Sequence, residues 1–139
     1  MTVLVDGRTA EGATRIFGGP VPQGALYAKH DFVEQNPKTT QALVSAIYKA
    51  QQWVAAASED EIIAALPPGY TAGDVELYRD MIRTAKQSLS REGKPSPEGL
   101  AAMLEMNKYD PELANAKVNL DATFDSRFID HVANAGMPR

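Results

Sequence analysis

Short apolar runs and turn-forming residues alternate over the first thirty positions of the chain. Residues 3–5 are three consecutive β-formers, residues 14–17 contain a second short apolar run, and residues 25–28 form a third. Short apolar runs that end at polar turn residues are typical of buried strands. Residues 18–24 are rich in glycine and proline and cannot form a regular element. The pattern therefore predicts two or three short strands at the start of the chain.

Beyond residue 31 the apolar positions recur with the spacing of helices. Asn36 followed by Pro37 is typical of a helix start, and the helix predicted from it runs over residues 37–57. Val44 and Tyr48 widen its apolar stripe, so we expect this helix to pack on two neighbours. The stripe itself consists of Leu43, Ile47, Ala50 and Val54.

Polar caps and helix breakers divide the rest of the chain into further helices. Ser58 with Glu61 has the form of a capping box, and residues 67–69 end the helix that follows. Several other residues mark helix ends in the same way. Asp31 with Glu34 resembles a capping box for one turn before Pro37, Thr71 or Asp74 opens a helix that Gly93 ends, Ser96 precedes Pro97 at the start of another, and Asp125 caps the last.

Two or three strands are too few for a sheet of ordinary size, because such small groups of strands are marginally stable alone. We therefore predict an α/β protein that is mostly helical, with its short strands at the N-terminus. The strand of residues 3–5 is expected to pair with strands that this sequence does not contain.

Composition and charge narrow the class of protein. The 139 residues are enough for one domain with a core, and the apolar content of 44% is ordinary for a globular protein. The net charge of −4 and the pI near 5.1 argue against binding to nucleic acid or to an anionic membrane surface. The chain has no cysteine, which excludes disulfides and thiolate chemistry. Asp6 and Arg8 interrupt the first apolar run, so we expect no signal peptide in these residues.

The common catalytic and metal-binding patterns do not occur in the sequence. His30 and His131 lie far apart, and neither has a histidine or cysteine at ligand spacing. Asp121 and Asp125 do not have the spacing of an EF-hand loop, so a helix cap is the better interpretation of Asp125. The glycine pair at residues 18–19 could bind an anion through backbone amides, although a plain turn is favoured. We therefore predict no enzymatic activity, no metal and no cofactor.

Arg8 has the most suggestive position among the charged residues, because it follows the carboxyl end of the predicted strand. Ligands of open α/β sheets collect beyond the carboxyl ends of the strands. An arginine there can bind a sulfonate, carboxylate or phosphate through two parallel hydrogen bonds. The alternative is an ordinary arginine in a surface loop.

As a whole, the sequence resembles the C-terminal part of periplasmic solute-binding proteins of ABC importers. The similarity is to the nitrate, sulfonate and taurine type, which includes proteins related to thiamine-pyrimidine binding. It is carried by four segments in order: VLVDGRTAEG with RIFGG, GALYAKHDFVEQNPKTTQALVSAIYKAQQWVAAASEDEIIAAL, SREGKPSPEGLAAML and VNLDATFDSRFIDHVANAG. Members of that family are about twice as long or longer, so the chain is expected to be a fragment.

The resemblance implies a two-lobed clamp that closes on a small solute. Residues 1–17 would be a remnant of the second lobe, residues 18–24 the crossover between lobes, and residues 25–139 the helical part of the first lobe. The ligand would be a small anionic or heterocyclic solute, and the candidate contacts are Asp6, Arg8 and Thr9. The resemblance also implies an ABC permease as partner and a periplasmic location.

Other interpretations remain open at this stage. The fragment could form homo-oligomers through exposed strand edges. The chain could instead be a free-standing helical interaction or regulatory protein that oligomerises through its N-terminal strand. An enzyme of the same two-lobed superfamily would need clustered catalytic residues, which the sequence lacks.

Overall fold

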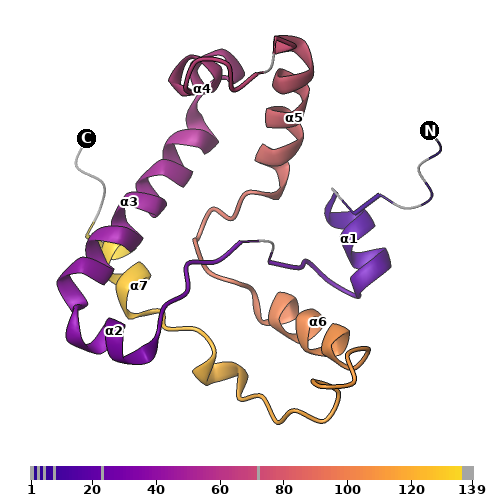
Figure 1. The fold of residues 1–139 in the computed structure, drawn as a ribbon, viewed down its shortest axis with the longest axis vertical. Helices are drawn as coiled ribbons and strands as arrows, with labels where there is room; N and C mark the ends of the chain where they lie inside the picture. Colours follow the sequence, from indigo (N-terminus) through magenta and orange to yellow (C-terminus); the bar gives the residue numbers. More distant parts are fainter. Residues whose placement is uncertain are drawn as a thin grey trace.

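A computed structural model describes residues 2, 4, 6–7, 9–22, 24–71 and 73–135. The described part of the chain is helical, with long non-helical segments between several of the helices (Figure 1). The elements are α1 (Ala10–Phe17), α2 (His30–Gln35), α3 (Pro37–Ala56), α4 (Glu59–Ala65), α5 (Val75–Ser88), α6 (Pro97–Asn107), the 3₁₀ helix η1 (Leu120–Ala122) and α7 (Arg127–Asn134).

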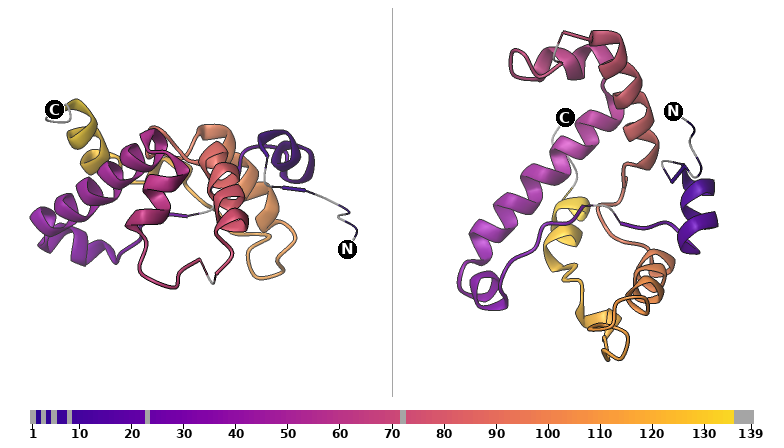
Figure 2. Two further views of the ribbon diagram at one scale, coloured as in Figure 1. Left: turned by 90° about the horizontal axis from the view of Figure 1, so that it is seen from above. Right: turned by 45° about the vertical axis from the view of Figure 1, so that its right-hand side comes forward.

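The helices contact one another mainly in pairs. α3, the longest helix, packs against α7, and the short α2 adjoins its N-terminal end. α4 and α5 form a second pair at the C-terminal end of α3, and α1 contacts α6. The two further views in Figure 2 show the same spread arrangement, in which several helices are joined by long connections and the helices do not stack in layers.

The predicted α/β class is wrong, because no residue that the structure describes forms a strand. Residues 14–17 belong to α1, and residues 25–28 form neither a helix nor a strand. Tyr27 in the latter segment is 92% exposed, so this run is not a buried strand. Of the predicted strand at residues 3–5, Val3 and Val5 lie outside the described residues, and Leu4 is 90% exposed in a bend. Oligomerisation through strand edges, including that of the free-standing alternative, therefore has no support in the described residues.

Local capping explains why α1 forms where a strand was expected. Thr9 is the N-cap and accepts a hydrogen bond from the Gly12 amide at 3.1 Å. Gly18 ends the helix with φ of 80°, and its N–H donates to the Thr14 carbonyl. The apolar positions Ala10, Ala13 and Phe17 are three and four residues apart, which is a helical spacing. A cap, this spacing and a closing glycine together are a signal that the sequence contained.

Most of the other helix starts agree with the sequence. α3 begins at Pro37 after Asn36, and α6 begins at Pro97, with the Ser96 hydroxyl accepting from the Gly99 amide. Asp74 caps α5 by accepting from the Leu77 amide. Two predicted caps differ from the structure. α2 begins after Lys29 without a side-chain cap, and the N-cap of α7 is Ser126, although the Asp125 carboxylate accepts from the Arg127 amide.

The core is small and centres on the contact between α3 and α7. Ile129 is 5% exposed and lies beside Gly93 and Tyr48, so this point joins two helices and the connection between α5 and α6. The Gln41 side chain also donates a hydrogen bond to the Phe128 carbonyl at 3.0 Å. Few other apolar side chains are as deeply buried in the described part; they are Ala57, Ile62, Ala102 and Val132.

We expect Ser58→Ala to lower the free energy of unfolding by about 1 kcal/mol, the usual cost of losing an N-cap. The Ser58 hydroxyl accepts from the Glu61 amide, and the Glu61 carboxylate accepts in return from the Ser58 amide at 2.8 Å. Urea unfolding followed by circular dichroism measures the change. Ser58→Asp should retain most of the stability, because aspartate is an equally good N-cap; equal losses in both variants would contradict the capping role.

Candidate functional site

The structure places two of the three predicted ligand contacts at the N-terminal end of α1. Asp6 is half-buried and Thr9 is exposed, with its hydroxyl oxygen accepting from the Gly12 amide. Arg8 lies outside the described residues, so its predicted role as an anion ligand stays a prediction. The positive end of the helix dipole lies at this end of α1, beside the acidic side chain of Glu11.

The chain before α1 folds back along this helix, which fixes the position of Asp6. A Cβ atom added to Gly12 would lie 1.8 Å from the Asp6 carbonyl oxygen. One added to Gly7 would lie 3.4 Å from Cδ1 of Ile16. Gly12 therefore allows a close approach of two backbone segments that no other residue would permit. Sequence reasoning did not single out Gly12, because its role depends on this non-local approach.

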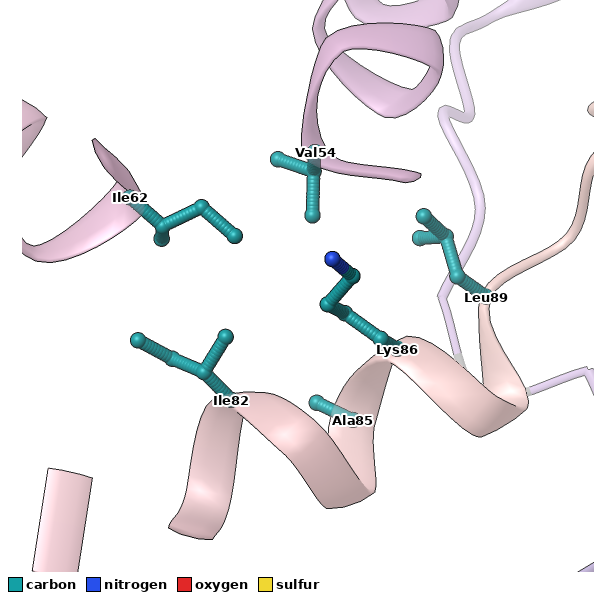
Figure 3. Close-up of a pocket in the computed structure, with 6 residues that line it drawn as sticks. All are labelled: Val54, Ile62, Ile82, Ala85, Lys86 and Leu89. Carbon is teal, nitrogen blue, oxygen red and sulfur yellow. The ribbon is translucent and has the colours of Figure 1, made fainter. Parts of the chain in front are cut away.

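A separate pocket opens between the end of α3, α4 and α5 (Figure 3). Its volume is about 120 Å³, and its exposed lining is almost entirely apolar. The lining residues are Val54, Ile62, Ile82, Ala85, Lys86 and Leu89. Val54 belongs to the apolar stripe that the sequence predicted for residues 37–57, but its convergence with side chains of α4 and α5 depends on how the three helices pair.

This pocket does not have the chemistry of a site for a charged solute. The charged group of the lining is the Lys86 ammonium, and it donates a hydrogen bond to the Ala57 carbonyl at the C-terminal end of α3. Sites for small molecules usually occupy about 300–1,000 Å³ and contain a few polar groups that orient the ligand. The pocket is therefore better described as an apolar gap between packed helices.

Ion pairs connect the helices at the surface. Arg127 at the start of α7 binds Asp125 at 2.7 Å and Glu34 of α2 at 2.6 Å, and its guanidinium carbon lies 5.4 Å from the centroid of the Phe128 ring. The hydrogen bond from Arg127 and, to a lesser degree, the nearby charge of His30 lower the pKa of Asp125. The Arg127–Glu34 pair links α2 and α7 at the surface.

A second ion pair predicts how stability depends on pH. The hydrogen bond from Lys94, with a smaller one from Ser126, lowers the pKa of Asp130 below its ordinary value of 3.8. A carboxyl whose pKa is lower in the folded state binds its proton more readily when unfolded. Its contribution to stability is thus complete above about pH 4 and is lost as the pH falls below this range through the folded pKa.

We therefore expect the melting temperature to fall on acidification from pH 6 to about pH 3, and to fall less in Asp130→Asn. Lys94→Met removes the other partner and should reduce the acid sensitivity in the same direction. Scanning calorimetry at several pH values measures both variants. An unchanged acid slope in both would show that the Lys94–Asp130 pair adds no pH-dependent stability.

The glycine pair and the second histidine, which the sequence analysis considered as candidate site residues, lie at structural positions. Gly18 is the C-cap of α1, and Gly19 is buried, with a Cβ there lying 3.4 Å from Ala102 and from the Glu98 carbonyl. His131 lies in the last turn of α7. Within the described ranges, no three histidine or acidic side chains are grouped closely enough to hold a metal ion. No helix there is long and apolar enough to cross a membrane.

The chain is similar to proteins of one known family and to a solved structure. Residues 5–66 match the NMT1-like family. A solved structure of a protein from Bordetella bronchiseptica RB50 is 35% identical and superposes with a TM-score of 0.88. The match covers 96% of this chain and 42% of that chain, so the chain spans less than half the length of its structural neighbour.

No curated protein matches the chain. The family match begins in the segment before α1 and ends at the C-cap of α4, and it therefore includes Asp6, Arg8 and Thr9. The family that residues 5–66 match is that of the nitrate-, sulfonate- and taurine-type solute-binding proteins of ABC importers, which confirms over these residues the resemblance that the sequence predicted.

Proposed function

We propose that the chain is part of the substrate-binding component of an ABC importer for a small anionic or heterocyclic solute, such as a sulfonate, nitrate or a thiamine precursor. The observation that carries the proposal is the NMT1-like match over residues 5–66. The structural neighbour supports it, because nearly the whole chain follows that fold at 35% identity. The partner would be an ABC permease, and the protein would work in the periplasm.

The arrangement around α1 is compatible with a contribution to the solute site. Asp6 and Thr9 lie together at the N-terminal end of α1, where backbone amides favour a negatively charged group. Arg8, which lies between them in the sequence, would supply a positive side chain, and a guanidinium binds sulfonates and carboxylates well. In this proposal Arg8 binds the anionic group, Thr9 donates its hydroxyl proton, and Asp6 accepts from donors of a heterocycle.

The proposed division of the chain follows from the same assignment. Residues 1–17 would belong to the second lobe, residues 18–24 would cross between lobes, and residues 25–139 would belong to the first lobe. The connection between α1 and α2 supports this division, since its described residues, 18–22 and 24–29, form no element of their own. Hinge closure in two-lobed binding proteins uses connections of this kind.

The proposal is tested by titrating the chain with taurine, nitrate and a hydroxymethylpyrimidine while recording amide chemical shifts by NMR, which detects weak binding. We expect one solute to shift amides of residues 6–12, and Arg8→Met to abolish the shifts. Arg15→Met, on the last turn of the same helix, is the matched control and should bind as the parent does. No shifts with any solute, or equal losses in both variants, would overturn the proposed site.

A further inference from the structure

One face of α3 is apolar and uncovered. The sequence predicted a stripe of Leu43, Ile47, Ala50 and Val54, yet Leu43 is 44% exposed and Ile47 is 43% exposed. Trp53, the single tryptophan of the chain, is 46% exposed beside them. We define the α3 apolar face by its exposed members, which are Leu43, Ala46, Ile47, Ala50 and Trp53.

The partners of α3 in this chain lie elsewhere on the helix. α7 packs on the side that carries Gln41 and Tyr48, roughly opposite the α3 apolar face at about 100° per residue. Near α4 and α5, Val54 of the stripe lines the pocket between the three helices. The face also lacks charge, because the charged residues of α3 are Lys38 and Lys49, and neither lies on it. A charge-free apolar stripe on a long helix is typical of a buried contact.

The total accessible surface shows that the chain as a whole leaves more surface exposed than a compact monomer of its mass does. The chain exposes 10,905 Å², whereas a compact monomer of 15.0 kDa exposes about 7,000 Å². The excess of roughly 4,000 Å² on this chain alone is more than the roughly 1,000–2,500 Å² that each partner of an ordinary obligate interface buries. Other apolar side chains are exposed on separate helices, among them Leu77 and Met81 of α5 and Met106 of α6. A partner that covers the excess must therefore contact several helices.

From these observations we propose that the α3 apolar face binds the polypeptide that corresponds to the rest of the homologous chain. In the Bordetella structure the same arrangement of helices makes up 42% of a longer chain, so the larger part of that chain remains to cover it. A second copy of this chain fits less well. A helix of 20 residues is about 30 Å long and 10 Å wide, so two α3 faces pairing together would cover only a small part of the excess. The proposal does not depend on which solute is bound.

The test uses a chimera in which these 139 residues replace the matched part of the Bordetella protein. Hydrogen exchange measured by mass spectrometry compares the amides of residues 43–53 in the chimera and in the chain alone. We expect exchange at least about 30-fold slower in the chimera, the factor expected when a well-packed contact covers the helix. Unchanged exchange in a folded chimera would overturn the proposal.

Two variants make the test specific to the face. Ile47→Lys should leave the chain alone unchanged, because the side chain is already exposed, but should remove the added protection in the chimera. Ala55→Lys changes an exposed position of α3 outside the face, so this variant should retain the added protection in the chimera. Light scattering of the chain alone measures whether it forms a dimer. A dimer that Ile47→Lys dissociates would assign the face to a second copy and overturn the proposal.

Discussion

Replacing Gly93 with alanine is expected to lower the free energy of unfolding by about 2–4 kcal/mol, from backbone strain together with overpacking. Gly93 has φ of 68°, which disfavours any side chain. A Cβ atom there would also lie 2.9 Å from Cδ1 of Ile129 and 3.3 Å from Cδ2 of Tyr48. The substitution therefore disturbs the point where α3, α7 and the connection after α5 meet. Urea unfolding followed by Trp53 fluorescence measures the loss.

Gly69→Ala is the matched control for this prediction. Gly69 has φ of 82°, and nothing lies within 4 Å of a Cβ added there, so the expected cost is backbone strain alone, about 1–2 kcal/mol. Ile129→Val provides a second check, because it removes the Cδ1 atom that the new methyl group meets. The double variant Gly93→Ala/Ile129→Val should thus lose less than the sum of the two single losses. Equal costs at Gly93 and Gly69 would show that the contact with Ile129 is not tight.

Ile62→Ala is expected to cost about 2–4 kcal/mol and to release α4 from α5. Ile62 is 8% exposed, and it borders the pocket of about 120 Å³, so removing its side chain enlarges a space that already exists. α4 has seven residues, and a helix this short is marginal without tertiary packing. The surface ion pairs between Arg79 and Asp60 and between Arg83 and Glu59 add at most about 1 kcal/mol each, too little to replace the apolar contact.

Hydrogen exchange of the α4 amides together with urea unfolding tests this prediction. Leu77→Ala is the matched control, since Leu77 is 58% exposed on the neighbouring α5, and its truncation should change the stability by less than about 1 kcal/mol. Faster exchange in α4 for Ile62→Ala alone is the expected result. Similar effects of the two variants would mean that Ile62 is not the residue that holds α4.

The starts of α3, α4 and α6 could be predicted because each depends on residues next to one another in sequence. Pro37 at the first position of α3 lacks the N–H that a helix start leaves unpaired, and Ser58 with Glu61 satisfies backbone groups of α4 locally, whatever the rest of the chain does. The same local evidence existed at α1, where Thr9 and Gly18 bracket a helical spacing. The β-forming run at residues 14–17 favours a strand, but local capping outweighs this weak propensity.

The packed face of α3 could not be predicted from its sequence. Leu43 and Ile47 are more apolar than Thr40 and Gln41, yet the latter pair lies on the more buried side. The choice depends on where α7 docks, and that is decided far along the chain. The candidate site is similar in this respect: the neighbourhood of Asp6 and Thr9 is local, but the approach of Asp6 to Gly12 is a tertiary feature.

The contact between α3 and α7 also has a consequence for biosynthesis. The hydrogen bond from Gln41 to Phe128 joins residues 87 positions apart, and Tyr48 and Ile129 meet across a similar separation. A ribosome that adds about 5–20 residues per second needs several seconds to reach α7 after it has completed the start of α3. During that interval the side of the nascent α3 that carries Gln41 and Tyr48 has no partner, and chaperones that bind apolar segments can act on the helix before the native pair forms.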